Sequence, residues 1–183
     1  MTSLTLYHDT APNAARTAQT DRAAIAAALA PAGAVLELWD PGAPLPDDTD
    51  DVAILAAYAA DIARLKARGG YQSVDVARVT PDHPARTEMR AKFLAEHVHD
   101  DDEVRFFVAG SGLFYVRAGG TVHALKCTAG DLVLLPVGTM HWFDMGAAPR
   151  FTAIRLFTTS DGWVARFTGD PIAQAIPLYE SGA

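Results

Sequence analysis

Short apolar runs at strand spacing, separated by glycines, fill the sequence from residue 98 onward and most constrain its fold. The runs are Val104–Val108, Gly112–Val116, Val122–Cys127, Leu132–Leu135 and Phe151–Phe157. Glycines fall at or between these runs, at positions 110, 112, 119, 120, 130 and 138. Tight turns between strands favour glycine. Several short strands at this spacing predict an antiparallel barrel or sandwich.

The first 95 residues show a mixed pattern, with helical spacing of apolar residues in some segments and strand spacing in others. Thr20 is the expected N-cap of a first helix, and Val52 belongs to the apolar face of a second. We expect strands at Leu4–His8, Ala34–Leu38 and Tyr71–Val79, helices at Thr20–Leu29, Asp51–Arg68 and Arg86–Glu96, and a loop at Pro41–Asp51.

Neither an internal repeat nor a linker composition is present, so the 183 residues are expected to form one domain around one core. The expected fold is mainly β with added helices (α+β), and the helices should lie mostly on the N-terminal side. An N-terminal α/β elaboration over 1–95 would precede an antiparallel β-barrel core over about 96–160 and a C-terminal extension to 183.

Two histidines and a glutamate at the start of the predicted barrel indicate a metal site. His97 and His99 are two residues apart, so on a strand their imidazoles face the same side and can bind one ion. Glu103 follows a short acidic turn and shares parity with Arg105 and Phe107 on the next strand. If Glu103 faces the barrel interior, those two side chains should face it as well.

A fourth ligand must come from elsewhere in the sequence, and His141 fits. It follows the run Leu132–Leu135 and a Pro136-x-Gly138 turn, which would redirect the chain so that the imidazole projects back into the barrel. Three imidazoles and one carboxylate suit a divalent first-row metal such as iron, nickel, cobalt or manganese. In six-coordination such a set leaves two positions open, as a catalytic site requires.

The spacing of these residues resembles the two motifs of the cupin superfamily, whose fold is a β-barrel of the jelly-roll (double-stranded β-helix) type. Ala91 stands where a glycine usually begins the first motif, and Met145 where an asparagine usually ends the second. Neither departure falls on a ligand position. The first motif is matched by His97-x-His99-x3-Glu103-x6-Gly110, and the second by Gly130-x5-Pro136-x-Gly138-x2-His141.

A closer resemblance, over roughly residues 50–170, is to the acireductone dioxygenase family. It rests on Tyr-Gln-Ser-x-Asp-Val at 71–76, Arg-x-Lys-Phe-Leu-x-Glu-His-x-His at 90–99, Asp-Glu-Val-Arg-Phe-Phe-Val at 102–108, His-Trp-Phe-Asp-Met-Gly at 141–146, Phe-Thr-Ala-Ile-Arg-Leu-Phe at 151–157 and Gly-Trp-Val-Ala-Arg-Phe-Thr-Gly-Asp at 162–170. The resemblance implies a dioxygenase that cleaves 1,2-dihydroxy-5-(methylthio)pent-1-en-3-one with O2 in methionine salvage. It also implies one Fe²⁺ or Ni²⁺ per chain.

By the same resemblance, the bound metal would decide the products. The iron form would give 4-methylthio-2-oxobutanoate and formate, and the nickel form 3-methylthiopropanoate, formate and carbon monoxide. Arg105 would stabilise the dianionic substrate, because an arginine that faces into a barrel beside a metal needs an anionic partner. Two alternatives stay open: another cupin oxygenase acting on a different enediol or diketone, and a non-catalytic cupin that binds a metal or a small ligand.

Two further acidic residues flank the ligands. Glu96 and Asp102 are expected to orient and tune the ligating imidazoles from outside the coordination shell. Asp100 and Asp101 are expected to form a solvated turn. The remaining histidines and the single cysteine are interpreted as ordinary structural residues: His8, His83, His123 and Cys127.

The pocket for the apolar tail of the substrate is less constrained by the sequence. Phe93, Phe107, Trp142 and Phe143 are most economically core residues, of which one or two would line that pocket; Phe93, Phe107 and Phe143 are the candidates. Arg155 either borders the pocket or lies on its strand facing solvent or pairing with an acid.

Charge and composition exclude several kinds of partner. A formal net charge of −7 without a Lys/Arg cluster disfavours nucleic acid and anionic membrane surfaces. No apolar run approaches the roughly 20 residues that span a bilayer, and the N-terminus lacks the features of a signal peptide. Cys127 is the only cysteine, so no intrachain disulfide is expected. We therefore expect a cytoplasmic monomer whose partners are a small-molecule substrate and O2.

Overall fold

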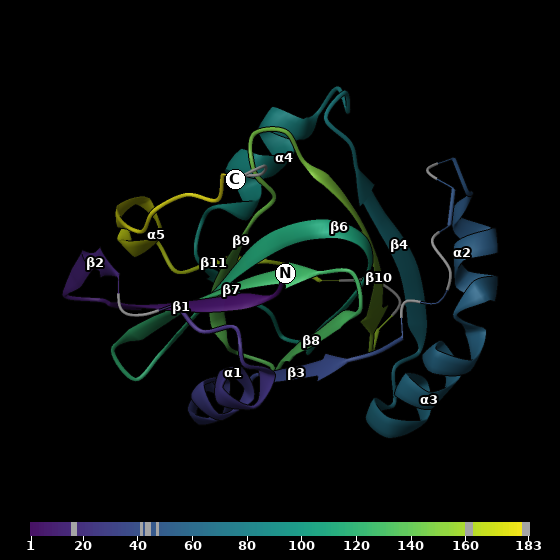
Figure 1. Cartoon of the computed structure of the whole chain (residues 1–183), viewed down its shortest axis with the longest axis horizontal. Helices are drawn as coiled ribbons and strands as arrows, with labels where there is room; N and C mark the ends of the chain where they lie inside the picture. Colours follow the sequence, from purple (N-terminus) through teal and green to yellow (C-terminus); the bar gives the residue numbers. More distant parts are fainter. Residues whose placement is uncertain (16–17, 41, 43–44, 47, 160–162, 181–183) are drawn as a thin grey trace.

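The computed structural model describes residues 1–15, 18–40, 42, 45–46, 48–159 and 163–180. Within these residues, eleven strands form one sheet that curls around itself (Figure 1). The strand pairs are antiparallel, and four of the five described α-helices precede residue 95. The prediction of a mainly antiparallel β fold with helices on the N-terminal side is confirmed.

The elements follow one another in a simple order along the chain. The helices are α1 (Arg22–Leu29), α2 (Asp51–Ala57), α3 (Ala59–Gly69), α4 (Arg86–Phe93) and α5 (Ile172–Ala175), with a 3-10 turn at Ala30–Ala32. The strands are β1 (Ser3–His8), β2 (Ala11–Ala15), β3 (Val35–Leu38), β4 (Ser73–Val79), β5 (His97–Val98), β6 (Glu103–Ala118), β7 (Thr121–Thr128), β8 (Asp131–Leu135), β9 (Met140–Asp144), β10 (Arg150–Phe157) and β11 (Arg166–Phe167). None of the described helices is long and apolar enough to cross a membrane.

The long strand β6 organises the sheet. Two strands were expected here, but the structure has one of 16 residues. Its first part pairs with β8 and β10, and its later part with β7 and β9. Gly110 lies between the two parts at a φ of 71°, and a Cβ there would lie 1.9 Å from the carbonyl oxygen of Arg150. The glycine therefore bends one strand between two ladders instead of ending it.

The prediction of one helix over Asp51–Arg68 is wrong in one respect, because the chain forms two helices, α2 and α3, that meet at Tyr58. The backbone of Tyr58 leaves the helical region, at φ −105° and ψ 18°. Its buried ring packs against Phe106, with the ring centroids 5.2 Å apart. Val52, expected on the apolar face, is 77% exposed. The apolar spacing continues in phase across the break, so the pattern could not reveal it.

Smaller differences occur at the helix ends and near the N-terminus. Asp21, not Thr20, caps α1, since its carboxylate accepts a hydrogen bond from the amide of Ala24 at 2.8 Å. Helix α4 ends at Phe93, because the chain beyond it turns into β5, which pairs with β9 and β11. Strand β2 was not expected. Positions 41, 43, 44 and 47 of the expected loop lie outside the described residues.

The core occupies both faces of the sheet. On the outer face, Phe106 and Ile154 pack with residues of α2 and α3, which lie along β4 and β10 (Figure 1). On the inner face, Phe107 packs with Phe114 and Phe143. Successive residues of a strand face opposite sides, so Glu103 and Arg105 share the inner side with Phe107, as their parity predicts. This alternation puts charged groups inside the curled sheet.

Candidate metal centre

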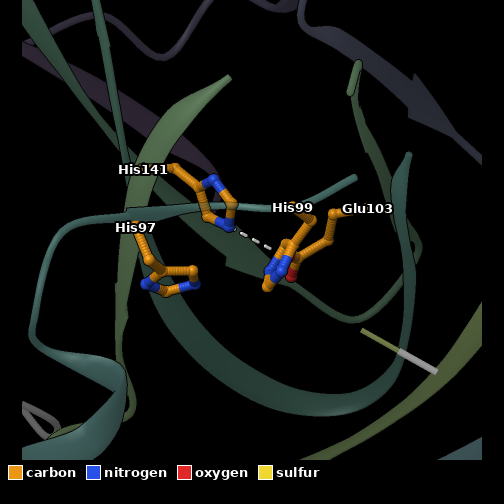
Figure 2. A group of neighbouring side chains, drawn as sticks. All are labelled: His97, His99, Glu103 and His141. Atoms are coloured by element: carbon orange, nitrogen blue, oxygen red, sulfur yellow. Dashed lines mark hydrogen bonds and ion pairs between the residues drawn. The ribbon is translucent and has the colours of Figure 1, made fainter. Parts of the chain in front are cut away.

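Four side chains that are far apart in the sequence meet inside the curled sheet (Figure 2). His97 lies on β5, His99 directly after it, Glu103 at the start of β6 and His141 on β9. Each offers one ligand atom, and these atoms all lie within 4.8 Å of one another. All four side chains are buried, so the point at which they meet lies inside the protein.

The three imidazoles are held in one tautomer by the main chain. A carbonyl oxygen can only accept a hydrogen bond, so each Nδ1 that bonds to one must carry the proton. In each ring, Nε2 is then the nitrogen left for a metal. The three bonds run from His97 to Ala95 at 2.7 Å, from His141 to Thr139 at 2.8 Å and from His99 to Val164 at 3.2 Å.

Glu103 supplies the one negative charge among the four. Its Oε2 lies 2.8 Å from Nε2 of His141 and 3.3 Å from Nε2 of His99. Its Oε1 accepts a hydrogen bond from Nη2 of Arg105 at 2.9 Å. Three imidazole nitrogens and one carboxylate oxygen, converging and buried, fit a single divalent cation. The four residues therefore form a metal-binding site.

Neighbouring charges and burial shift the pKa values of three of the four ligands. Burial opposes ionisation of Glu103, but Arg105 and His141 outweigh burial and hold the pKa of this carboxyl well below its usual range. Burial, and then His141, lower the pKa of His97 to about 4. Burial also lowers the pKa of His141, yet the charge of Glu103 and its hydrogen bond outweigh it and raise that pKa. His97 is thus free to ligate near neutral pH, whereas His141 holds its proton to a higher pH than an ordinary histidine does.

A cavity of about 470 Å³ opens onto the four ligands. Its walls carry aromatic rings and charged groups, an arrangement suited to a small molecule with an apolar part and an anionic part. Phe93, Phe143 and Arg155, expected near the substrate, line it. Phe107 lies behind the wall, in the core. Further lining residues are Ser73, Val74, Asp75, Lys92, Phe157, Trp163, Ala165 and Phe167.

Arg105 joins the ligands to the cavity. Its side chain is buried, pairs with Glu103 and lies over the ring of Phe143 at 4.6 Å from the centroid. Its Nε is buried and has no hydrogen-bond partner among the described residues. A buried donor without a partner costs free energy, and an anionic ligand in the cavity would relieve that cost.

Glu96 and Asp102 support the ligand-bearing segment through other partners. Glu96 is buried, lies 2.7 Å from Nε of Arg117 and accepts a hydrogen bond from Thr168 at 2.7 Å. Asp102 accepts hydrogen bonds from the hydroxyl of Tyr71 at 3.2 Å and from the amide of Val137 at 3.0 Å. These contacts fix the chain on either side of the ligands, and no described contact joins either carboxylate to a ligating imidazole.

Asp101 differs from the expectation of a solvated turn. It is buried and accepts hydrogen bonds from both the amide and the hydroxyl of Thr158, each at 2.8 Å. That partner is 57 residues away, so the local acidic run could not reveal it. Asp100 is exposed and pairs with Arg166 on the surface.

Two residues at the site were not singled out from the sequence. Trp163 stacks on His99 with centroids 5.7 Å apart, and its indole nitrogen donates to the carbonyl of Asp102 at 3.0 Å. Asp75 holds Arg155 by two hydrogen bonds of 2.8 and 2.6 Å. Both lie within the segments similar to the acireductone dioxygenase family, and that similarity was the available signal.

Comparison with known proteins gives a consistent result. A model of the ARD/ARD′ family matches residues 32–165. An acireductone dioxygenase of Parvibaculum lavamentivorans is 56% identical over 181 residues, which cover 99% of this chain and 98% of the relative. One from a Synechococcus strain is 52% identical, covering 97% and 99%. A solved structure, the acireductone dioxygenase from Bacillus anthracis with a cadmium ion in its active centre, is 30% identical with a TM-score of 0.79, covering 91% and 98%.

Proposed function

The chain belongs to the ARD/ARD′ family, and from this premise we propose that it is a dioxygenase that cleaves acireductone with O2 at a divalent metal ion. The observation that carries the proposal is the buried group of His97, His99, Glu103 and His141 at the floor of a cavity that Arg105 also lines. A small molecule and O2 are the reactants. A bound divalent ion supplies Lewis-acid and template chemistry there.

Arg105 binds the anionic part of the substrate in this proposal. An enediol conjugated to a carbonyl loses a proton readily, since the resulting charge spreads over several oxygens. The free Nε–H of Arg105 and its positive charge stabilise such an anion, while Glu103 keeps the guanidinium in place. In a buried site a charge-assisted hydrogen bond of this kind is stronger than one between neutral groups.

The aromatic walls receive the methylthio-alkyl tail and exclude water. Phe93 and Phe143 lie with their ring centroids 6.4 Å apart, and Trp163 and Phe157 lie 4.6 Å apart. Rings of this kind offer apolar area and polarisable contacts to a thioether. Phe107 supports Phe143 from behind, and Arg155 borders the same cavity.

We further propose that either iron or nickel occupies the site and sets the products. Neutral imidazoles and one carboxylate accept several divalent first-row ions, so the ligands themselves do not choose between the two. Iron would give 4-methylthio-2-oxobutanoate and formate. Nickel would give 3-methylthiopropanoate, formate and carbon monoxide. Reconstitution with each metal followed by product analysis tests this part: identical products from both forms would contradict it.

The remaining proposals concern the whole chain and the residues beside the ligands. Glu96 and Asp102 hold the ligand-bearing segment in register through their contacts with Arg117 and Tyr71. The chain forms one domain and acts as a monomer in the cytoplasm. Sedimentation of the purified protein tests the monomer, since a dimer would have twice the 19.5 kDa mass of the chain.

The deciding experiment combines metal analysis with oxygen uptake on freshly generated acireductone. We expect about one iron or nickel per chain and uptake that disappears on chelation. Glu103→Ala should lose both bound metal and uptake, whereas Glu88→Ala, on the exposed side of α4, should keep both. Metal binding without uptake would reject the proposed reaction while leaving the metal site in place.

A further inference from the structure

Apart from its histidines, the cavity is lined by two carboxylates and three basic side chains. Glu103 and Asp75 are the carboxylates, and each already has an arginine partner. Nη2 of Arg105 lies 2.9 Å from Glu103, and Nη2 of Arg155 lies 2.6 Å from Asp75. The fifth of these residues, Lys92, has no ion pair or hydrogen bond within the described part of the chain. Lys92 is therefore the basic side chain of the cavity that lacks a carboxylate partner among the described residues.

Lys92 is placed at the opening of the cavity by helix α4. It occupies the last turn of that helix and is exposed to solvent, yet it lines the cavity. Phe93, the next residue, packs toward Phe143 on the cavity wall. Lys92 thus lies where the cavity meets water, whereas Arg105 is buried inside it.

The charge of the whole chain makes this position significant. The net charge is −7, so an anion approaching the protein is on average repelled. A cation at the mouth of a concave, low-dielectric site concentrates the local field and offsets that repulsion. Of the three lysines at 66, 92 and 126, Lys92 lines the cavity.

We propose that Lys92 attracts the anionic enediolate to the mouth of the cavity. This inference rests on the proposed function for the identity of the substrate. The ammonium group acts on the charge of the incoming anion and takes no part in bond cleavage. Its contribution therefore lies in capture and binding, whereas Arg105 acts on the bound substrate.

Steady-state kinetics at varied salt test the proposal. Lys92→Gln in the metal-loaded enzyme should lower kcat/KM roughly three- to tenfold at low ionic strength and leave kcat within about twofold. The difference should vanish near 1 M salt, where the Debye length is about 3 Å. Lys92→Arg should restore the wild-type value. Lys66→Gln, which removes the same charge from α3, is the matched control and should behave as wild type.

Quenching of tryptophan fluorescence gives a readout that needs no turnover. Trp163 lines the cavity, whereas Trp39 and Trp142 are buried elsewhere in the core. Lys92→Gln should reduce quenching by the anion iodide and leave quenching by neutral acrylamide unchanged, and Trp163→Phe should remove the iodide-sensitive signal. Lys66→Gln should change neither.

The outcomes separate the two proposals. If Lys92→Gln matches Lys66→Gln in both kinetics and iodide quenching, Lys92 does not attract anions and the inference is overturned. If the wild-type enzyme shows no uptake on acireductone but iodide quenching depends on Lys92, the proposed reaction is rejected. The attraction of anions by Lys92 is then supported without that substrate.

Discussion

His97 and His141 are direct partners in the sheet, paired across β5 and β9, with ring centroids 4.5 Å apart. The pairing joins two motifs that lie 44 residues apart in the sequence. Because β9 also pairs with β6, the strand that begins at Glu103, the same sheet carries the third ligand. The geometry of the metal site thus depends on the register of these strands. Changes in charge or backbone near the ligands should therefore alter metal binding, activity or stability in predictable directions.

Metal affinity should depend on pH through His141. Its pKa is raised above the ordinary histidine value in the apo-protein, because Glu103 outweighs burial. Below that pKa each bound ion must displace one proton, so affinity should rise about tenfold per pH unit and level off above it. His97, with a pKa of about 4, releases no proton near neutrality. Titration calorimetry of nickel binding in buffers of different ionisation enthalpy measures the proton release.

The same shift affects the stability of the apo-protein with the opposite sign. A histidine whose folded pKa exceeds its unfolded value stabilises the fold below the unfolded pKa, near 6.5, and this contribution is lost as pH rises through the folded pKa.

For the calorimetry of nickel binding, a heat of binding that does not depend on the buffer at pH 6 would contradict a protonated His141.

Arg105→Lys should separate the charge of this residue from its geometry. Lysine keeps a cation beside Glu103 but has no Nε–H on a planar fork, so it cannot pair with the carboxylate and reach the substrate at the same time. We expect metal content close to wild type and kcat/KM about 100-fold lower, the loss typical of a removed charge-stabilising donor. Metal analysis and oxygen uptake on the same preparation check this. Full activity in the lysine variant would show that the Nε–H of Arg105 does not contribute to substrate binding or turnover.

Asp101→Ala should destabilise the fold, whereas Asp100→Ala should not. Removing the carboxylate leaves the amide and hydroxyl of Thr158 without their acceptors, at a cost of about 1–3 kcal/mol. Asp100→Ala breaks only an exposed ion pair with Arg166 and should change stability by less than about 0.5 kcal/mol. Urea unfolding of the two variants measures the difference, and equal stabilities would show that Asp101 is dispensable.

Gly110→Ala should be far more damaging than Gly119→Ala. Both glycines have positive φ, 71° and 56°, so alanine costs about 1 kcal/mol of backbone strain at either position. At Gly110 the added Cβ would also lie 1.9 Å from the carbonyl oxygen of Arg150, whereas nothing lies within 4 Å at Gly119. We expect Gly110→Ala to lower the melting temperature by several degrees more than Gly119→Ala. Thermal unfolding followed by circular dichroism checks the order.

The parts of the site that depend on short-range spacing could be predicted from the sequence. His97 and His99 face the same side because they are two residues apart, and the parity of Arg105 follows from that of Glu103. The turn before His141 is marked by a proline and a glycine. Each of these signals lies within a few residues of the group it positions, and the curled antiparallel sheet then brings the segments together.

The parts that depend on distant partners could not be predicted. Arg155 was open to three interpretations because its partner, Asp75, lies 80 residues earlier. The structure combines two of them, since Arg155 pairs with an acid and lines the cavity. At Tyr58 the helix breaks although the apolar pattern continues, and its ring packs against Phe106 on a distant strand. In each case the feature involves a tertiary contact that leaves no trace in the local pattern.

The hydrogen bonds that fix the three imidazoles end on the main chain, at the carbonyls of Ala95, Thr139 and Val164. The side chains of these residues do not make the bonds, and that of Val164 is 70% exposed. Amino-acid replacements at these positions leave every acceptor in place, so the ligand tautomers are robust to sequence drift. Only an insertion, a deletion or another change in backbone path would reset them. The orientation of the three imidazoles therefore depends on the path of the backbone and not on which side chains occupy these three positions.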